Sequence, residues 1–169
     1  MEQTQYSPEW TEIGQSVINE FADEKFKNIA ELGISIGYVL SKESPDRNGK
    51  AKLAECIAVK KDHQAQFIPH DYIIKIYEPN VAYMNDMQKR ILMEHELMHI
   101  RATEDSNGDL KIQTAPHEIE DFKDIIEKYG IDWAQDLHQQ MTWDEYETDE
   151  EETDQVEGER LQLPEEETA

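Results

Sequence analysis

Five residues, His95-Glu96-Leu97-Met98-His99, combine side chains and a spacing that suit metal-dependent hydrolysis. On an α-helix, histidines four positions apart are separated by about 40° and about 6 Å, so both imidazoles leave the same face and can bind one ion. Imidazole nitrogens are good zinc ligands, and a glutamate beside the first histidine can take a proton from metal-activated water. The pattern predicts a zinc site formed by His95 and His99, with Glu96 as general base.

The alternative interpretation of this stretch is an amphipathic core helix whose histidines are hydrogen-bonded without a metal. Burying two imidazoles and Glu96 in that way would be costly, because buried polar groups need a metal or charged partners to compensate for lost hydration. The sequence therefore favours the metal site.

A catalytic zinc usually has three protein ligands and one water, so a third ligand must come from elsewhere in the chain. Turn-forming residues 103–109 would reverse the chain after the motif. This reversal makes His117, eighteen residues beyond His99, the best candidate. The other histidines outside the motif are His63, His70 and His138.

Carboxylates that follow His117 leave an alternative open. Glu118, Glu120 or Asp121 could supply the third ligand instead, because two histidines and one glutamate also form known zinc sites. Glu120 and Asp121 could equally accept a hydrogen bond from a ligating imidazole and orient it.

The elements around the motif can also be predicted. Residues 86–101 contain no glycine or proline and are rich in helix-forming side chains, so they are expected to form a helix. Residues 110–113 suit a short extended piece. A second helix is expected to start at Thr114-Ala115-Pro116, to carry His117 in its first turn and to stop at Gly130. Residues 131–138 suit one more short helical piece, with Trp133 covering the core.

The N-terminal half predicts one helix and three strands. Ser7-Pro8-Glu9 is typical of a helix start, and apolar residues recur at helical spacing to about residue 30 or 31. Residues 34–40, 53–59 and 71–77 are strand-like, the first two as partners in a hairpin and the third buried on both faces for part of its length. The predicted fold class is α+β, with an N-terminal helix, a small three- to four-stranded sheet, the motif helix and a following C-terminal helix.

Acidic residues are distributed unevenly along the chain. The 169 residues carry a formal net charge of −23, and residues 144–169 hold 13 acidic side chains against Arg160 alone. That segment lacks the apolar content needed to offset the entropy of ordering, which predicts a domain at 1–143 and an acidic, disordered tail at 144–169. A surface this acidic makes direct binding of nucleic acid unlikely, whereas a basic partner protein would suit it.

Cysteine usage and hydropathy suggest a location. Cys56 is the single cysteine, which excludes an internal disulfide and a cysteine-clustered zinc site and fits a reducing compartment. The polar N-terminus does not resemble a signal peptide, and no stretch approaches membrane-spanning length. The expected setting is the cytoplasm.

Residues 8–134, taken in order, resemble the phage metallopeptidase domain family, which is similar to the SprT-like zincins. The resemblance rests on the initial helix, the strand at 34–40, the strand Asp71–Ile76 before His95–Ile100, and the segment from His117 to Gly130. It implies a zincin-like fold, zinc held by His95, His99 and His117, and Glu96 as general base in the hydrolysis of a peptide or protein substrate. It also implies a phage or prophage origin and a host-cytoplasmic setting.

Two questions about function stay open at this level. The group that would stabilise the oxyanion could be any of four tyrosines: Tyr72, Tyr77, Tyr83 or Tyr129. The second hypothesis for the whole chain is an acidic zincin-fold interaction protein, an inhibitor or nucleic-acid mimic, that binds a basic host factor without catalysis. Its support is the net charge, which would accelerate association with a cationic partner and make it sensitive to salt.

Overall fold

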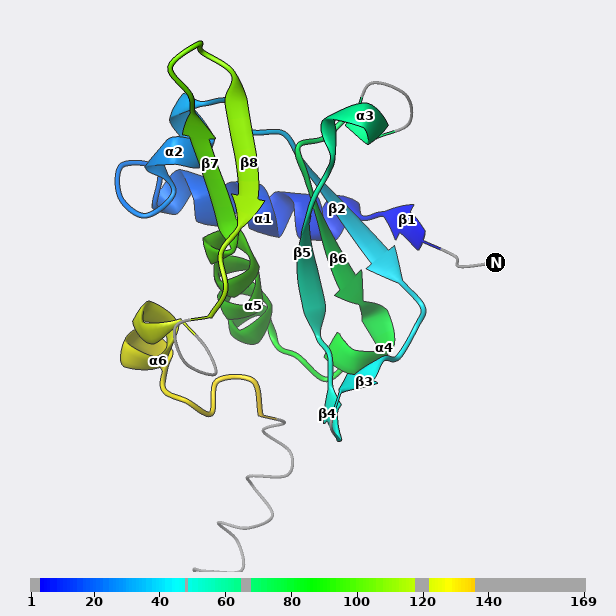
Figure 1. The fold of residues 1–169 in the computed structure, drawn as a ribbon. Helices are drawn as coiled ribbons and strands as arrows, with labels where there is room; N and C mark the ends of the chain where they lie inside the picture. The colour runs from blue at the N-terminus through cyan, green and yellow to red at the C-terminus, as the bar shows by residue number, and fades with distance from the viewer. Residues whose placement is uncertain (1–3, 48, 65–67, 118–121, 136–169) are drawn as a thin grey trace, which may run out of the picture. The chain divides into compact units, whose positions relative to one another are not determined.

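The computed structural model describes residues 4–47, 49–64, 68–117 and 122–135 (Figure 1). All its helices and strands belong to one unit, Met1–Ala134, and the predicted boundary at residue 143 lies outside the described residues. The fold is α+β, with a small mixed sheet, as the sequence predicts. Its elements, in chain order, are β1 (Thr4–Tyr6), α1 (Pro8–Glu20), α2 (Lys27–Glu31), β2 (Ile36–Ser41), β3 (Asp46–Arg47), β4 (Lys50–Ala51), β5 (Ala54–Ala58), α3 (Lys61–Gln64), β6 (Tyr72–Tyr77), α4 (Glu78–Val81), α5 (Asp86–Met98), β7 (Ile100–Glu104), β8 (Leu110–Thr114) and α6 (Lys123–Tyr129).

The main sheet has four strands in the order β1-β2-β6-β5. β2 runs parallel to β6, whereas β5 runs antiparallel to it. The predicted hairpin between the first two strands is therefore wrong, because β6 lies between β2 and β5. β6 carries the fully buried side chains Tyr72, Ile74 and Ile76. Between β2 and β5, both edges of β6 are hydrogen-bonded and these apolar side chains are removed from water.

α1 begins as the sequence predicts, with Ser7 as its cap: the Ser7 hydroxyl accepts the Trp10 N–H at 3.3 Å. The helix ends at Glu20 rather than near residue 30, and a turn separates it from α2. In this turn the rings of Phe21 and Phe26 meet edge to face, with centroids 6.0 Å apart. Lys25 lies in this break, and its ammonium group contacts the buried Glu94 carboxylate on α5.

α5 is the predicted motif helix. Asn85 caps it and forms a reciprocal capping box with Gln88, and the helix ends at Met98. It packs against α1 on one side and β5 on the other. Most of its second half is buried, so the motif lies between the helical layer and the edge strand of the sheet.

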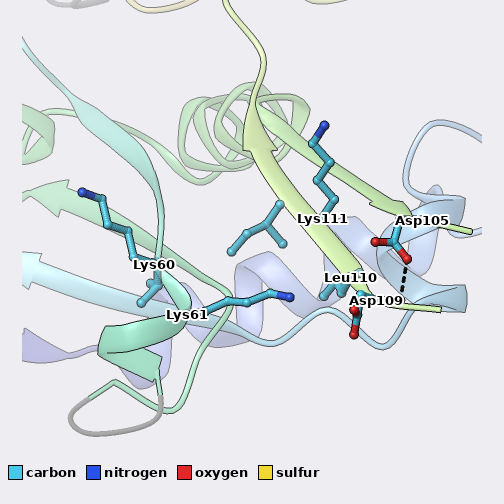
Figure 2. A pocket seen from close by; sticks show the side chains of 8 residues that line it. Lys60, Lys61, Asp105, Asp109, Leu110 and Lys111 are labelled. Carbon is cyan, nitrogen blue, oxygen red and sulfur yellow. Dashed lines mark hydrogen bonds between the residues drawn. The ribbon is translucent and has the colours of Figure 1, made fainter. Parts of the chain in front are cut away.

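β7 and β8 form an antiparallel hairpin, of which the sequence predicts the turn and β8 but not β7. In the turn the Asp105 carboxylate accepts the Asn107 N–H at 2.8 Å. It also accepts the Asp109 N–H at 3.0 Å (Figure 2). The fully buried Tyr72 on β6 anchors the hairpin to the sheet. Its hydroxyl lies 2.8 Å from the Gln113 carbonyl and accepts the Gln113 N–H at 3.0 Å.

The second predicted helix starts later than expected. Thr114 belongs to β8, and residues 115–117 are not helical, so His117 follows a strand instead of occupying the first turn of a helix. α6 begins at Lys123 and ends at Tyr129, and its cap residue Gly130 has a φ of 83° that allows the helix to stop there. Residues 131–134 form a turn rather than a helix, and Trp133 packs against the core as predicted.

No helix in the described ranges combines the length and the hydropathy that a membrane crossing needs.

The contact of α1 with β2 gives a test of the packing. A Cβ at Gly14 would lie 2.4 Å from Cζ of the buried Tyr38. Alanine usually stabilises a helix by about 1 kcal/mol relative to glycine, but here Gly14→Ala should lower the free energy of unfolding by about 1–3 kcal/mol, because the tyrosine ring has to move. Urea unfolding measures this change. Glu12→Ala, on the exposed face of α1, is the control, and a stabilised Gly14→Ala variant would contradict the packing.

Candidate metal centre

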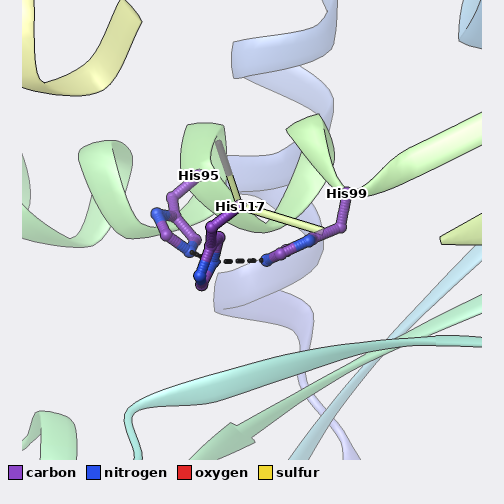
Figure 3. A group of neighbouring side chains, drawn as sticks. All are labelled: His95, His99 and His117. Atoms are coloured by element: carbon purple, nitrogen blue, oxygen red, sulfur yellow. Dashed lines mark hydrogen bonds between the residues drawn. The ribbon is translucent and has the colours of Figure 1, made fainter. Parts of the chain in front are cut away.

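Three histidines from two separate segments meet beside α5 (Figure 3). His95 lies in the helix and is buried, whereas His99 is its half-buried C-terminal cap residue, with helical backbone angles. His117 is exposed and comes from the segment after β8. The Nε2 atom of His117 lies 2.9 Å from Nε2 of His95 and 3.0 Å from Nε2 of His99. The structure thus brings together all three predicted ligands.

The backbone of the hairpin fixes the orientation of one ligand. Nδ1 of His99 lies 2.6 Å from the carbonyl oxygen of Ala115, and because a carbonyl only accepts, Nδ1 must carry the proton. A neutral His99 then presents a lone pair on Nε2, which faces the other two histidines. The Ala115 N–H donates in return to the His99 carbonyl at 2.7 Å. This pair of bonds fastens the end of β8 to the end of α5.

The three imidazole nitrogens could hold a metal ion. Two ring nitrogens on one tetrahedral zinc are about 3.3 Å apart, close to the separations seen between His117 and its two neighbours. Nitrogen atoms this close need a shared proton or a shared cation between them. Within the described ranges, His95, His99 and His117 are the one group of potential metal-ligating side chains whose donor atoms all lie within 4.8 Å of one another.

The remaining predicted ligand candidates do not join this group or cannot be placed. His70 contacts the Ser35 hydroxyl through Nδ1 at 2.9 Å, and its ring packs near Tyr6. His63 lines a different hollow, next to β1 and β6. The other candidates lie outside the described residues: Glu118, Glu120, Asp121 and His138.

Glu96 and the three histidines line a cleft of about 1170 Å³ between α5, β5 and the end of β8. Glu96 is 4% exposed, so its carboxylate is largely removed from bulk water. Cys56 on β5 lines the same cleft, and burial, followed by the charge of Glu96, raises the pKa of its thiol well above the ordinary value. This thiol therefore stays neutral.

Two aromatic side chains that the sequence analysis did not connect with the site surround the histidines. The Phe122 ring centroid lies 5.3 Å from His95, 4.8 Å from His99 and 5.3 Å from His117. Trp133 lies 6.0 Å from His95, and its carbonyl accepts a hydrogen bond from Gln88 at 3.1 Å. Their apolar spacing predicts burial but does not indicate which residues they cover.

A buried carboxylate next to the motif holds the helix behind the site. Glu94 is 2% exposed, and its two oxygens accept hydrogen bonds from Lys25 and from the Tyr129 hydroxyl, each at 2.5 Å. Burial and the charge of Glu94 raise the pKa of Tyr129, so the hydroxyl remains a donor. Because Tyr129 lies on α6 and Phe122 immediately precedes that helix, this bond helps to hold Phe122 against the histidines.

The hydroxyl groups of the four tyrosines considered as oxyanion stabilisers all form hydrogen bonds with other parts of the chain. Burial raises the pKa of Tyr72 to about 12, and its hydroxyl is bonded to the hairpin backbone. The hydroxyls of Tyr77, Tyr83 and Tyr129 donate to Glu55, to the Ala134 carbonyl and to Glu94. Among the described residues that line the cleft there is no tyrosine.

The bond between Tyr129 and Glu94 predicts a stability change. Tyr129→Phe removes a hydrogen bond to a buried charged group, so it should lower the free energy of unfolding by about 1.5–3 kcal/mol. Tyr83→Phe is the matched control, since it removes a hydroxyl bond to a backbone carbonyl from a side chain that is 37% exposed and should cost less than 1.5 kcal/mol, or about half as much. Equal losses in urea unfolding would argue against a special role for the bond to Glu94.

Comparison with known proteins gives one result. No curated protein and no solved structure matches the chain. A family model described as "Putative phage metallopeptidase" matches residues 3–142, which is most of the sequence and includes the three histidines and Glu96. A metallopeptidase family implies a metal cofactor and a peptide or protein substrate. The chain therefore belongs to this phage metallopeptidase family.

Proposed function

We propose that the protein is a zinc-dependent peptidase with a zincin-like fold, encoded by a phage or prophage and acting in the host cytoplasm. The observation that carries the proposal is the convergence of three imidazoles, from α5 and from the segment after β8, beside the buried carboxylate of Glu96. Three histidines and an adjacent glutamate are typical of catalytic zinc sites.

In this proposal His95, His99 and His117 hold the metal, and Glu96 moves the proton. A zinc ion in such a site lowers the pKa of water toward about 7 and polarises a carbonyl group. Glu96 accepts the proton of the attacking water and then donates it to the leaving nitrogen of the peptide bond. Its burial suits this role, because removal from bulk water favours proton transfer over full solvation of the charge.

The edge strand β5 offers a place for the substrate. β5 pairs with β6 on one side and borders the cleft on the other. An extended peptide can add to the edge of a sheet through main-chain hydrogen bonds. A substrate bound in this way would pass the histidines with one of its peptide bonds close to Glu96.

The second candidate function rests on charge. A net charge of −23, with 13 acidic residues after position 143, favours binding to a basic host protein with or without catalysis. Under this alternative, deletion of residues 144–169 would weaken function, whereas Glu96→Gln would leave it intact.

Metal content tests the proposed centre. Wild-type protein purified with zinc should contain one zinc per chain by elemental analysis, and His99→Ala and His117→Ala should each lose it, because two remaining imidazoles bind zinc far more weakly. His70→Ala is the control, since His70 bonds to Ser35 and lies outside the group. A wild-type protein without metal after zinc addition would refute the proposal.

The role of Glu96 needs a separate experiment. Glu96→Gln keeps the size of the side chain but cannot accept the proton, so it should retain zinc and lose peptidase activity by at least about a hundredfold. Cleavage of an unfolded protein such as casein measures the activity. A fully active Glu96→Gln variant would exclude this residue as the general base.

A further inference from the structure

We propose that the surface between β5 and β8 selects acidic polypeptides, so that the substrate carries Glu or Asp on both sides of the bond that is cleaved. The inference rests on the proposed peptidase function and adds a substrate class to it. Its basis is a set of lysines that line two hollows along these strands, in a chain that is otherwise strongly acidic.

The two hollows lie at opposite ends of β5. The first is the cleft that contains the histidines, and Lys50 and Lys52 line it where the chain enters β5. The second, of about 390 Å³, lies beyond the other end of β5 and includes Lys60, Lys61 and Lys111 in its lining. Lys61 extends from the start of α3 toward β8 (Figure 2). β5 and β8 contact each other, and the two hollows lie at the two ends of this contact, so a polypeptide that lies across both strands would reach both sets of lysines.

Most other cations of the described chain are neutralised locally. Ion pairs within 4.0 Å join Lys25 to Glu94, Lys27 to Glu31, Lys75 to Glu43, Lys89 to Glu9, Arg90 to Glu20 and Lys123 to Glu127. In the described ranges, by contrast, no ion pair is formed by Lys50, Lys60, Lys61 or Lys111. These four lysines are therefore available to a ligand, as are Lys42 and Arg101 elsewhere on the chain, whereas Lys128 lies over the rings of Phe21 and Tyr129.

Acidic groups in the same hollows do not cancel the lysines. Asp105 and Asp109 line the second hollow against three lysines, and the Asp105 carboxylate already accepts two N–H groups of the hairpin turn. In the cleft, Glu55 is bonded to Lys52 and to the Tyr77 hydroxyl. With Glu96 included, the two hollows hold five lysines and four carboxylates, so their side chains carry a formal charge of +1 in a chain whose net charge is −23.

This distribution has a direct consequence for recognition. The net charge of −23 repels an acidic peptide from most of the surface, whereas the lysines attract it to the strands beside the histidines. Exposed charge pairs are weak individually, and their effect is largest on association and on discrimination between ligands. The lysines would therefore select among substrates without binding any of them tightly.

Peptide binding to the full-length Glu96→Gln protein, loaded with zinc, tests the inference without requiring catalysis. The probes are three fluorescein-labelled versions of one peptide, with Glu, Gln or Lys at the same positions on both sides of a constant centre. We expect the Glu peptide to bind most tightly by fluorescence anisotropy and its advantage to shrink at high ionic strength. Lys61→Gln combined with Lys111→Gln should weaken binding of the Glu peptide by roughly threefold to tenfold.

The control is Lys27→Gln combined with Lys123→Gln, which removes the same charge from exposed helical positions and should leave binding of the Glu peptide nearly unchanged. Equal or tighter binding of the Gln or Lys peptide, equal losses in the two double variants, or no binding of any peptide would overturn the inference.

Cleavage of the same peptides by the wild-type protein separates the two proposals. Cleavage without preference for acidic residues would keep the peptidase function and overturn the substrate class. Selective binding of the Glu peptide without cleavage would keep the acidic-ligand site and refute the peptidase function.

Discussion

The candidate site depends on the paired hydrogen bonds between His99 and Ala115. One bond sets the tautomer of a ligand, and the other joins the last turn of α5 to the strand that returns from the hairpin. Because β8 also bonds to the Tyr72 hydroxyl, the return path of the chain is fixed relative to both the helix and the sheet. His117 reaches the motif histidines as a consequence of these backbone contacts, and its own side chain has to contribute little to the positioning.

Burial of charged groups on α5 is the second constraint. Glu94, His95 and Glu96 are consecutive and all are at most 9% exposed. Glu94 is compensated by Lys25 and Tyr129, which brings the turn after α1 and the helix α6 against the motif. The position of the aromatic residues around the histidines therefore depends on a carboxylate that has no proposed part in the chemistry. A helix with three consecutive buried polar side chains is stable only where neighbouring elements supply a partner to each of them.

The sequence predicted the parts of this structure that depend on local signals. The helix start at Ser7-Pro8-Glu9, the helix-forming composition after Asp86, the strand pattern of residues 71–77 and the His95-to-His99 spacing need no knowledge of distant contacts. Strand order, by contrast, depends on distant contacts. The expected hairpin of β2 with β5 was wrong because β6, which has the greater apolar content, takes the position between them. His117 was predicted as a ligand for a partly wrong reason: Pro116 suggested a helix start, whereas the structure uses β8 to return the chain. The contacts of Phe122 with three imidazoles could not be predicted, since apolar periodicity indicates burial but does not identify the buried partners.

All three histidines lie between residues 95 and 117, in a stretch that contains the end of α5 and the β7–β8 hairpin. Helix and hairpin formation are fast local events on the scale of microseconds. The parallel pairing that joins Ile36 to Tyr72 is non-local, and its loop-closure entropy makes it slow. The ligands are thus local in the chain, while the sheet that supports them is not. A metal ion present during folding would meet its ligands before the sheet is complete, so metal affinity would contribute to the rate of folding as well as to the stability of the finished structure.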